Sequence, residues 1–201
     1  MLARWRHVPT AIIADVSNGA CLIDPDIRPL IPAGRQPRLF GRAVTAMCAP
    51  PDFGAVLHAL DGLVAGDVLV IAAQGHRDNA MIGGILGGHL RRKGAAGIVC
   101  DGAVRDVAEL AAWSDLSVYA RFITPRGPTA WQQGEVNAPV EIGGRVISAG
   151  DLVIGDDDGL VSLTSEEMTT LISKAEAKLS LEADWQKSLA AGQSVKETFG
   201  L

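Results

Sequence analysis

An arginine and an aspartate stand side by side directly after a short apolar run. The segment reads GAAGIVCDGAVRD, and its last two residues are Arg105 and Asp106. The guanidinium supplies a fixed positive charge and the carboxylate is a ligand for hard divalent cations. Residues just beyond the carboxyl end of a buried strand also stand where open α/β sheets place their ligands. The pair is therefore the first candidate for chemistry.

The same residues also fit a purely structural role. Asp106 is followed three residues later by Glu109, and the apolar segment VAELAAW comes next. Asp-x-x-Glu before an apolar run is typical of a capping box at the start of a helix. Spacing alone leaves both interpretations open.

A second candidate is the glycine-rich run that spans residues 81–86. It opens a helical pattern, and the free amides and positive dipole end of a helix suit a carboxylate. The alternative is that Gly83, Gly84, Gly87 and Gly88 lie near one helix face so that the helix packs closely on a sheet. The spacing by itself favours this packing explanation.

The elements that must position these residues alternate between strand and helix. The pattern predicts a strand at 38–49, a helix at 52–63, a strand at 66–73, a polar loop at 74–80, a helix at 81–94 and a strand at 96–102. The last two strands should be parallel neighbours with a right-handed crossover. The fold class is therefore α/β with central βαβ units.

The character of the sequence changes in its second half. A short helix at 107–113 and a strand at 117–122 precede β-branched runs that are broken by Gly-Gly and Asp-Asp-Gly turns, which predict hairpins. A long helical pattern begins at Ser165, the expected N-cap residue, and Glu166 and Glu167 fall in its first turn. We expect one α/β core over 1–164 and a helical extension over 165–201 that packs on the core or on a neighbouring subunit.

Composition excludes several classes of protein. The 201 residues carry a net charge of −5 and are only 4% aromatic, which argues against a nucleic-acid-binding surface. The three cysteines form no Cys-x-x-Cys pair, so neither a disulfide framework nor a thiolate metal site is indicated. No apolar run is long enough for a membrane span, and the start lacks the apolar stretch of a signal peptide. We expect a cytoplasmic protein whose partners are small molecules or protein chains.

Several motifs together resemble the RraA-like family, which includes 4-hydroxy-4-methyl-2-oxoglutarate (4-carboxy-4-hydroxy-2-oxoadipate) aldolases and relatives with oxaloacetate decarboxylase activity. The resemblance runs through most of the chain, in AGDVLVIAAQG, the glycine-opened helix, KGAAGIVCDGAVRD, PVEIGG and AGDLVIGDDDGLVSL. It implies a swivelling β/β/α-type fold that assembles into homotrimers or hexamers, with each active site near a subunit boundary.

The resemblance also implies a role for each candidate residue. Asp106 would hold a divalent cation, Mg²⁺ or Mn²⁺, and Arg105 would contact the carboxylate and keto oxygens of a 2-oxo acid. Glu182, on the C-terminal helix, would reach the site of a neighbouring subunit. The backbone that binds the same oxo acid would be that of Gly83, Gly84, Ile85 and Leu86.

The implied activity is that of a metal-dependent lyase. Cleavage of a 4-hydroxy-2-oxo acid and decarboxylation of oxaloacetate both leave a pyruvate enolate, whose growing charge a cation and a guanidinium can stabilise. No lysine is placed for a Schiff base. The alternative is a non-catalytic regulator that inhibits a ribonuclease by direct contact, as RraA itself does.

One position departs from the aldolase pattern. These enzymes carry an Asp or Glu twenty-one residues before the arginine, and that position is Gly84 in this chain. A carboxylate that would organise water for proton transfer is therefore missing. His76, Asp78 or Glu182 could replace it, although each also has an ordinary explanation as a loop or surface residue.

Overall fold

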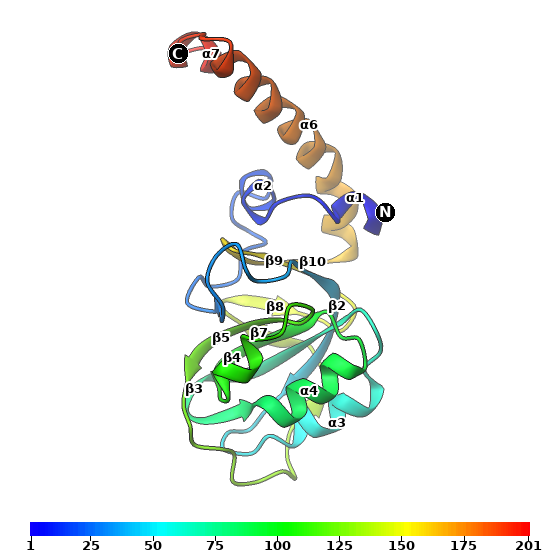
Figure 1. The fold of residues 1–201 in the computed structure, drawn as a ribbon. Coiled ribbons are helices and arrows are strands. Elements are labelled where there is room, and N and C mark those ends of the chain that lie inside the picture. Colours follow the sequence, from blue (N-terminus) through cyan, green and yellow to red (C-terminus); the bar gives the residue numbers. More distant parts are fainter.

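A sheet of eight strands forms the body of the molecule in the computed structural model, which describes all residues Met1–Leu201 (Figure 1). The strands follow the order β1-β5-β4-β3-β2-β9-β10, and β6 pairs with β2, so that the sheet curves towards a barrel. Their bounds are β1 Arg28–Pro29, β2 Leu39–Met47, β3 Asp67–Ile82, β4 Gly97–Val104, β5 Ser117–Ile123, β6 Glu135–Val136, β9 Leu152–Asp156 and β10 Gly159–Leu163. A separate hairpin joins β7 (Val140–Ile142) to β8 (Arg145–Ile147).

The centre of the sheet is parallel, as the alternation of strands and helices predicts. Strands β2, β3, β4 and β5 pair in parallel, and their connections contain the helices α3 (Gly54–Gly62), α4 (Gly84–Arg92) and α5 (Val107–Leu110). All eight residues of β4 are buried, which suits a strand covered on both faces. The mixed α/β class is confirmed, and the hairpins expected in the second half of the chain are present.

The segment between β3 and α4 differs from the prediction. Residues 74–80, predicted as a loop, continue β3, because its pairing with β4 tolerates register shifts around His76 and Ala80. Met81 and Ile82 end this strand instead of opening the helix, and both are buried. Helix α4 therefore begins only at Gly84, after Gly83 in extended backbone.

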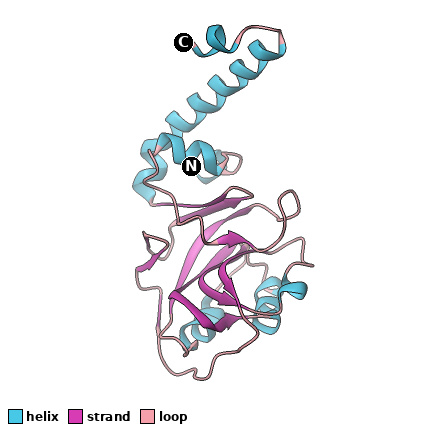
Figure 2. Ribbon diagram, turned by 90° about the vertical axis from the view of Figure 1, so that its left-hand side faces the viewer, coloured by secondary structure: helices cyan, strands magenta, loops and turns pink.

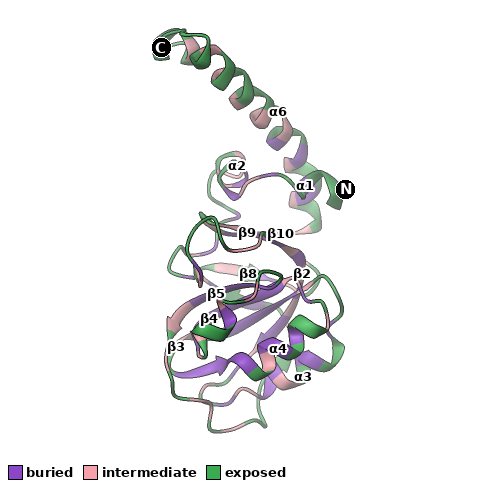
Figure 3. Ribbon diagram, in the orientation of Figure 1, coloured by how far each residue is buried: buried purple, intermediate pink, exposed green.

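Three apolar clusters hold the layers together. One lies between the sheet and α3 and α4, the second lies under the β7–β8 hairpin, and the third joins β9 and β10 to the remaining helices. These are α1 (Leu2–Trp5), α2 (Thr10–Val16) and the long α6 (Ser165–Ala190). Figure 2 shows the strands between these two groups of helices, and Figure 3 shows the buried residues concentrated in the strands.

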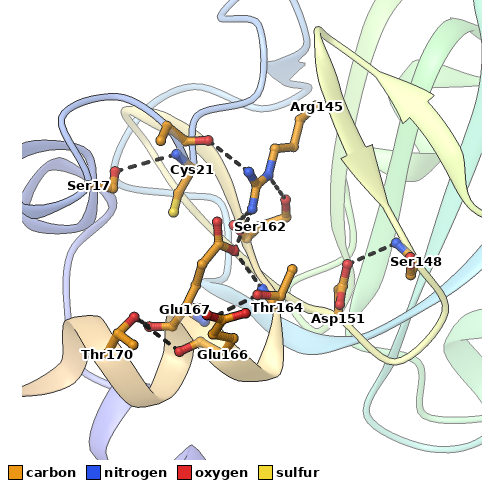
Figure 4. Close-up of polar contacts among 11 residues, drawn as sticks. Ser17, Cys21, Arg145, Ser148, Asp151, Ser162, Thr164, Glu166, Glu167 and Thr170 are labelled. Atoms are coloured by element: carbon orange, nitrogen blue, oxygen red, sulfur yellow. Dashed lines mark hydrogen bonds and ion pairs between the residues drawn. The ribbon is translucent and has the colours of Figure 1, made fainter.

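The start of α6 is fixed by a polar cluster (Figure 4). Thr164, and not Ser165, is the N-cap residue, because the Thr164 hydroxyl accepts a hydrogen bond from the Glu167 amide at 3.2 Å. The Glu167 carboxylate accepts the Thr164 amide in return at 2.8 Å, and Arg145 donates to the same carboxylate at 2.5 Å. A capping box and an ion pair thus clamp the helix to the β7–β8 hairpin.

The remainder of α6 leaves the body of the molecule. Its buried residues are Met168, Ile172 and Ala175, all in its first half. Figures 1 and 3 show the rest projecting outwards with an exposed surface, followed by α7 (Val195–Phe199). No helix is long and apolar enough to span a membrane. The division at residue 164 stays a prediction.

Candidate active site

Asp106 caps a helix, but not the helix that follows it. It precedes α5 with a positive φ of 58°, and its side chain makes no capping bond to that helix, so the Asp106–Glu109 capping box is a wrong interpretation. Instead, Asp106 Oδ2 accepts a hydrogen bond from the Gly84 amide at 2.9 Å. The carboxylate therefore lies at the positive end of α4.

Gly83 allows this approach. A side chain at Gly83 would place its Cβ 2.5 Å from Asp106 Oδ2 and 2.7 Å from Arg105 Cγ, closer than real contacts permit. Gly127 makes room for the other end of Arg105 in the same way, since a Cβ added at Gly127 would lie 2.6 Å from Arg105 Nη1. The two glycines leave room for Arg105 and Asp106 against the start of α4.

Gly87, by contrast, serves packing. The nearest atoms to a Cβ at Gly87 belong to Leu110 and Trp113, at 2.9 and 3.1 Å. The packing explanation therefore holds for Gly87, although its partners lie in and after α5 and not in the sheet. At Gly88 a Cβ would make only ordinary contacts, the nearest at 3.4 Å from Arg92 Nη1.

Arg105 and Asp106 open into one hollow of about 190 Å³. Arg105 Nε lies 3.6 Å from Asp106 Oδ2, and the two side chains are 39% and 44% exposed. The Arg105 guanidinium donates no hydrogen bond to the protein, so its donors are free for a ligand. The hollow is lined by Phe53, Leu57, Ala80, Met81, Ile82, Gly83, Ile85, Leu86, Arg105, Asp106 and Pro128.

A buried aspartate fixes one wall of this hollow. Asp52, the residue before Phe53, accepts hydrogen bonds from the amides of Gly54 at 2.8 Å and Gln132 at 2.9 Å. Burial opposes the charged form, but these backbone donors outweigh it and lower the pKa of Asp52 below its ordinary value. Asp52 therefore stays charged and positions the start of α3.

Glu109 is the residue that sequence reasoning missed. A side chain at Gly84 would place its Cβ 2.0 Å from Glu109 Oε2 and 2.7 Å from Glu109 Cδ. The Glu109 carboxylate thus fills the space that a side chain at position 84 would take. Its spacing from Asp106, one helical turn, was the available signal, and it was interpreted as a cap.

The other proposed replacements lie elsewhere. Neither His76 nor Asp78 lines the hollow. His76 Nε2 accepts the amide of Asn79 at 3.1 Å, and Asp78 is exposed beside Arg77. Their ordinary explanation as local polar residues agrees with these contacts.

Glu182 lies far from the hollow within one chain. Its carboxylate is 3.7 Å from Lys178 Nζ, and Lys178 also contacts Asp15 of α2 at 3.3 Å. Figure 1 shows α6 and α2 beyond β9 and β10, on the opposite side from α4. Any role for Glu182 at this hollow would require a second copy of the chain.

Fold and hollow together define a mixed α/β protein in which a guanidinium without hydrogen bonds to protein and a helix-bound carboxylate lie beyond the end of a parallel strand. Comparison with known proteins gives the class a name. Residues 10–162 match the RraA-like family described as Aldolase/RraA, and the chain belongs to that family.

Individual relatives are similar over most of their length. A protein of Halalkalibacterium halodurans named "Putative 4-hydroxy-4-methyl-2-oxoglutarate aldolase" is 32% identical over 88% of this chain and 82% of its own. The structure of the RNA-processing inhibitor RraA from Thermus thermophilis is 30% identical, with a TM-score of 0.67 over 77% of this chain and 91% of that one. An uncharacterized protein from Pseudomonas syringae shares the fold, with a TM-score of 0.85 and 24% identity over 98% of this chain and 95% of that one.

Proposed function

We propose that this protein is a divalent-metal-dependent lyase that releases pyruvate, by retro-aldol cleavage of 4-hydroxy-2-oxo acids, by decarboxylation of oxaloacetate, or by both. The observation that carries the proposal is the pair Arg105–Asp106, which lines one hollow at the start of α4 with the Arg105 guanidinium making no hydrogen bond to protein. The aldolase name of a relative at 32% identity supports the same class of reaction.

The donor atoms suit a hard divalent cation that is held loosely. No group of three or more His, Cys, Asp or Glu side chains is arranged to enclose a metal ion. Mg²⁺, however, is usually bound by one or two carboxylates and completed by water and substrate oxygens. Asp106 offers such a carboxylate, with Oδ1 free of hydrogen bonds, and would hold Mg²⁺ or Mn²⁺. When bound, the cation supplies Lewis-acid charge at the keto oxygen.

The oxo acid itself would lie across the start of α4. The amides of the first turn have no acceptor within the helix, and that of Gly84 is taken by Asp106. Those of Ile85 and Leu86, with the backbone of Gly83 and Gly84 beside them, would bind the substrate carboxylate. The Arg105 guanidinium would bind the keto oxygen and stabilise negative charge as it grows there.

Glu109 is placed for the proton transfer. In the retro-aldol reaction a base takes the proton of the C4 hydroxyl, the C3–C4 bond breaks, and its electron pair passes to the keto oxygen as an enolate. C4 leaves as a carbonyl compound, and protonation of the enolate at C3 gives pyruvate. The Glu109 carboxylate lies against Gly84 and lines the neighbouring hollow, not the one that holds Arg105 and Asp106. For a substrate bound across the start of α4, it would accept the first proton and return the second.

Decarboxylation of oxaloacetate uses the same enolate. There the C3–C4 bond breaks with loss of carbon dioxide, and no hydroxyl proton has to be removed. Arg105 would therefore matter equally to both reactions. Glu109 would protonate C3 in both, but would remove the hydroxyl proton only in the retro-aldol reaction.

Glu182 would complete the site in an oligomer. Because α6 projects from the body of its own chain, its exposed half can lie against a neighbouring copy in a trimer or hexamer. In that arrangement the Glu182 carboxylate would be a second acidic group near the reacting centre.

The test is pyruvate release, measured through coupled oxidation of NADH by lactate dehydrogenase, with Mg²⁺ or Mn²⁺. We expect turnover that stops with a chelator, falls by about 10³-fold in Asp106→Ala and falls by about 10²-fold in Glu109→Gln. Asp158→Ala, at an exposed carboxylate in the β9–β10 turn, is the control and should match the wild type. Absence of metal-dependent turnover on all such substrates would reject the proposal.

A second candidate is a protein-binding regulator of ribonuclease activity. It is favoured by the 30% identity to an RNA-processing inhibitor and by Gly84, which lacks the carboxylate of the aldolases. Capture of purified ribonuclease E by this chain, together with silence in the pyruvate assay, would select this function. Robust turnover would instead select the lyase.

A further inference from the structure

A second hollow adjoins the first across the start of α4. It has a volume of about 650 Å³ and is more open, and Gly84, Gly88, Arg92, Glu109 and Trp113 contribute to its walls. The exposed side chain of Ile85 borders both hollows. A substrate whose oxo-acid end occupies the first hollow would therefore extend into the second.

The free cation of this second hollow is Arg92. The neighbouring Arg91 is already matched, since its Nε donates to Asp115 at 2.5 Å and its guanidinium lies over the Trp113 ring. Arg92 has no carboxylate within salt-bridge distance and is exposed. Its Nη1 lies 3.4 Å from the position that a Cβ at Gly88 would take, and both residues line the hollow.

The order of these groups along α4 matches the order of atoms in a 4-hydroxy-2-oxo acid. Asp106 caps Gly84 where the oxo acid would begin, and Glu109 covers the side-chain position of Gly84. Gly88, beside Arg92, follows one helical turn later on the same face, about 5–6 Å away. A group attached to C4 would therefore lie beyond Glu109 and reach the Arg92 guanidinium.

We infer that Arg92 is a specificity-determining residue, which binds a carboxylate on the part of the substrate beyond C4. The inference rests on the proposed lyase function and adds to it the residue that would bind the second carboxylate of a diacid such as 4-hydroxy-4-methyl-2-oxoglutarate. A guanidinium at the rim binds the tail in the ground state and in the transition state alike. Its loss should therefore raise KM and leave kcat nearly unchanged.

Two substrates that differ at one group test this assignment. 4-Hydroxy-2-oxoglutarate ends in a carboxylate, and 4-hydroxy-2-oxopentanoate has a methyl group in its place. For Arg92→Ala we expect KM for the first to rise at least about tenfold and KM for the second to stay within about twofold. Arg92→Lys should recover part of the loss, because it restores the charge without the fork of donors.

Arg35→Ala is the matched control, since Arg35 is an exposed arginine in the loop before β2 and does not line either hollow. It should change neither KM. Equal effects of Arg92→Ala on both substrates, or no effect on either, would overturn the role of Arg92 while the lyase function stands. Lack of turnover of both substrates by the wild type would overturn the lyase function and, with it, the specificity inference.

Discussion

Two arginine–aspartate clusters differ in how fully their charges are matched: Arg105 and Asp106 directly follow β4, whereas Arg121 on β5 contacts Asp101 on β4. Arg121 donates to Asp101 at 2.6 Å and to Asp24 at 3.0 Å, and its side chain is only 15% exposed. Arg105 makes no hydrogen bond to protein, stands 3.6 Å from Asp106 and is 39% exposed.

The two environments decide which arginine can bind a ligand. The donors of Arg121 are committed to protein carboxylates, and this contact contributes to a pKa for Asp24 that lies below its ordinary value, after the larger contribution of the Asp26 amide. Arg105 has only a long ion pair with Asp106, at 3.6 Å, so that its hydrogen-bond donors remain available for a ligand. An arginine whose donors are all taken by protein carboxylates indicates a structural cluster, whereas one whose donors remain free indicates a candidate site.

The largest expected effect separates activity from stability at Arg105. Arg105→Ala should lower the rate of pyruvate release by about 10³-fold, because the developing enolate loses its fixed positive charge. The free energy of unfolding should stay within about 0.5 kcal/mol of the wild type, because the single ion pair of Arg105, with Asp106, is long and partly exposed to solvent. The coupled pyruvate assay measures the rate, and urea denaturation measures the stability. A clear loss of stability in Arg105→Ala would show that Arg105, like Arg121, is a structural residue.

The converse holds for Arg121. Arg121→Ala should lower the free energy of unfolding by about 3 kcal/mol, because Asp101, which is buried, and Asp24 lose their partner. Among molecules that remain folded, turnover should be close to that of the wild type. Urea denaturation at constant pH measures the loss, and a stability equal to that of the wild type would show that this cluster is not structural.

A smaller and pH-dependent effect is expected at the start of α6. Burial opposes ionisation of Glu167, but the Thr164 amide and Arg145 outweigh it and lower the pKa of Glu167 below its ordinary 4.5. Its stabilising contribution is therefore complete above about pH 4.5 and is lost as the pH falls through the lowered value. Glu167→Gln should cost about 1–2 kcal/mol at pH 7.

Urea denaturation of Glu167→Gln and the wild type at several pH values tests whether the stabilisation by Glu167 is lost in acid. The difference between the two proteins should narrow below about pH 4. Glu166→Gln, a neighbouring residue outside the capping box, is the control and should change little at any pH. A difference that widens in acid would contradict the proposed cause.

Some of this could be predicted from the sequence because it depends on neighbours in the chain. Arg105 and Asp106 follow a mostly apolar strand, and the parallel pairing of β3 with β4 follows from the alternation of patterns. Residues 74–80 misled the prediction, because a strand with shifted register can carry polar residues. The choice of Thr164 over Ser165 as N-cap depended on one backbone conformation.

The features that could not be predicted depend on contacts between residues that are distant in the sequence. Gly84 indicates a missing carboxylate, but only the fold shows that Glu109, twenty-five positions later, fills that volume. The sequence likewise does not show that Asp106 caps α4 in place of α5, since that bond crosses between two connections. Glu182 requires contacts that one chain does not contain.

The central claim is that Arg105 and Asp106 act together on one oxo acid. Titration calorimetry with oxalate, a planar dianion that resembles the pyruvate enolate, tests it most directly in the presence of Mg²⁺. We predict one site per chain, with affinity reduced at least about tenfold in both Arg105→Ala and Asp106→Asn and unchanged in Asp158→Ala. Oxalate binding of wild-type strength in the first two variants would show that Arg105 and Asp106 do not bind the oxo acid together.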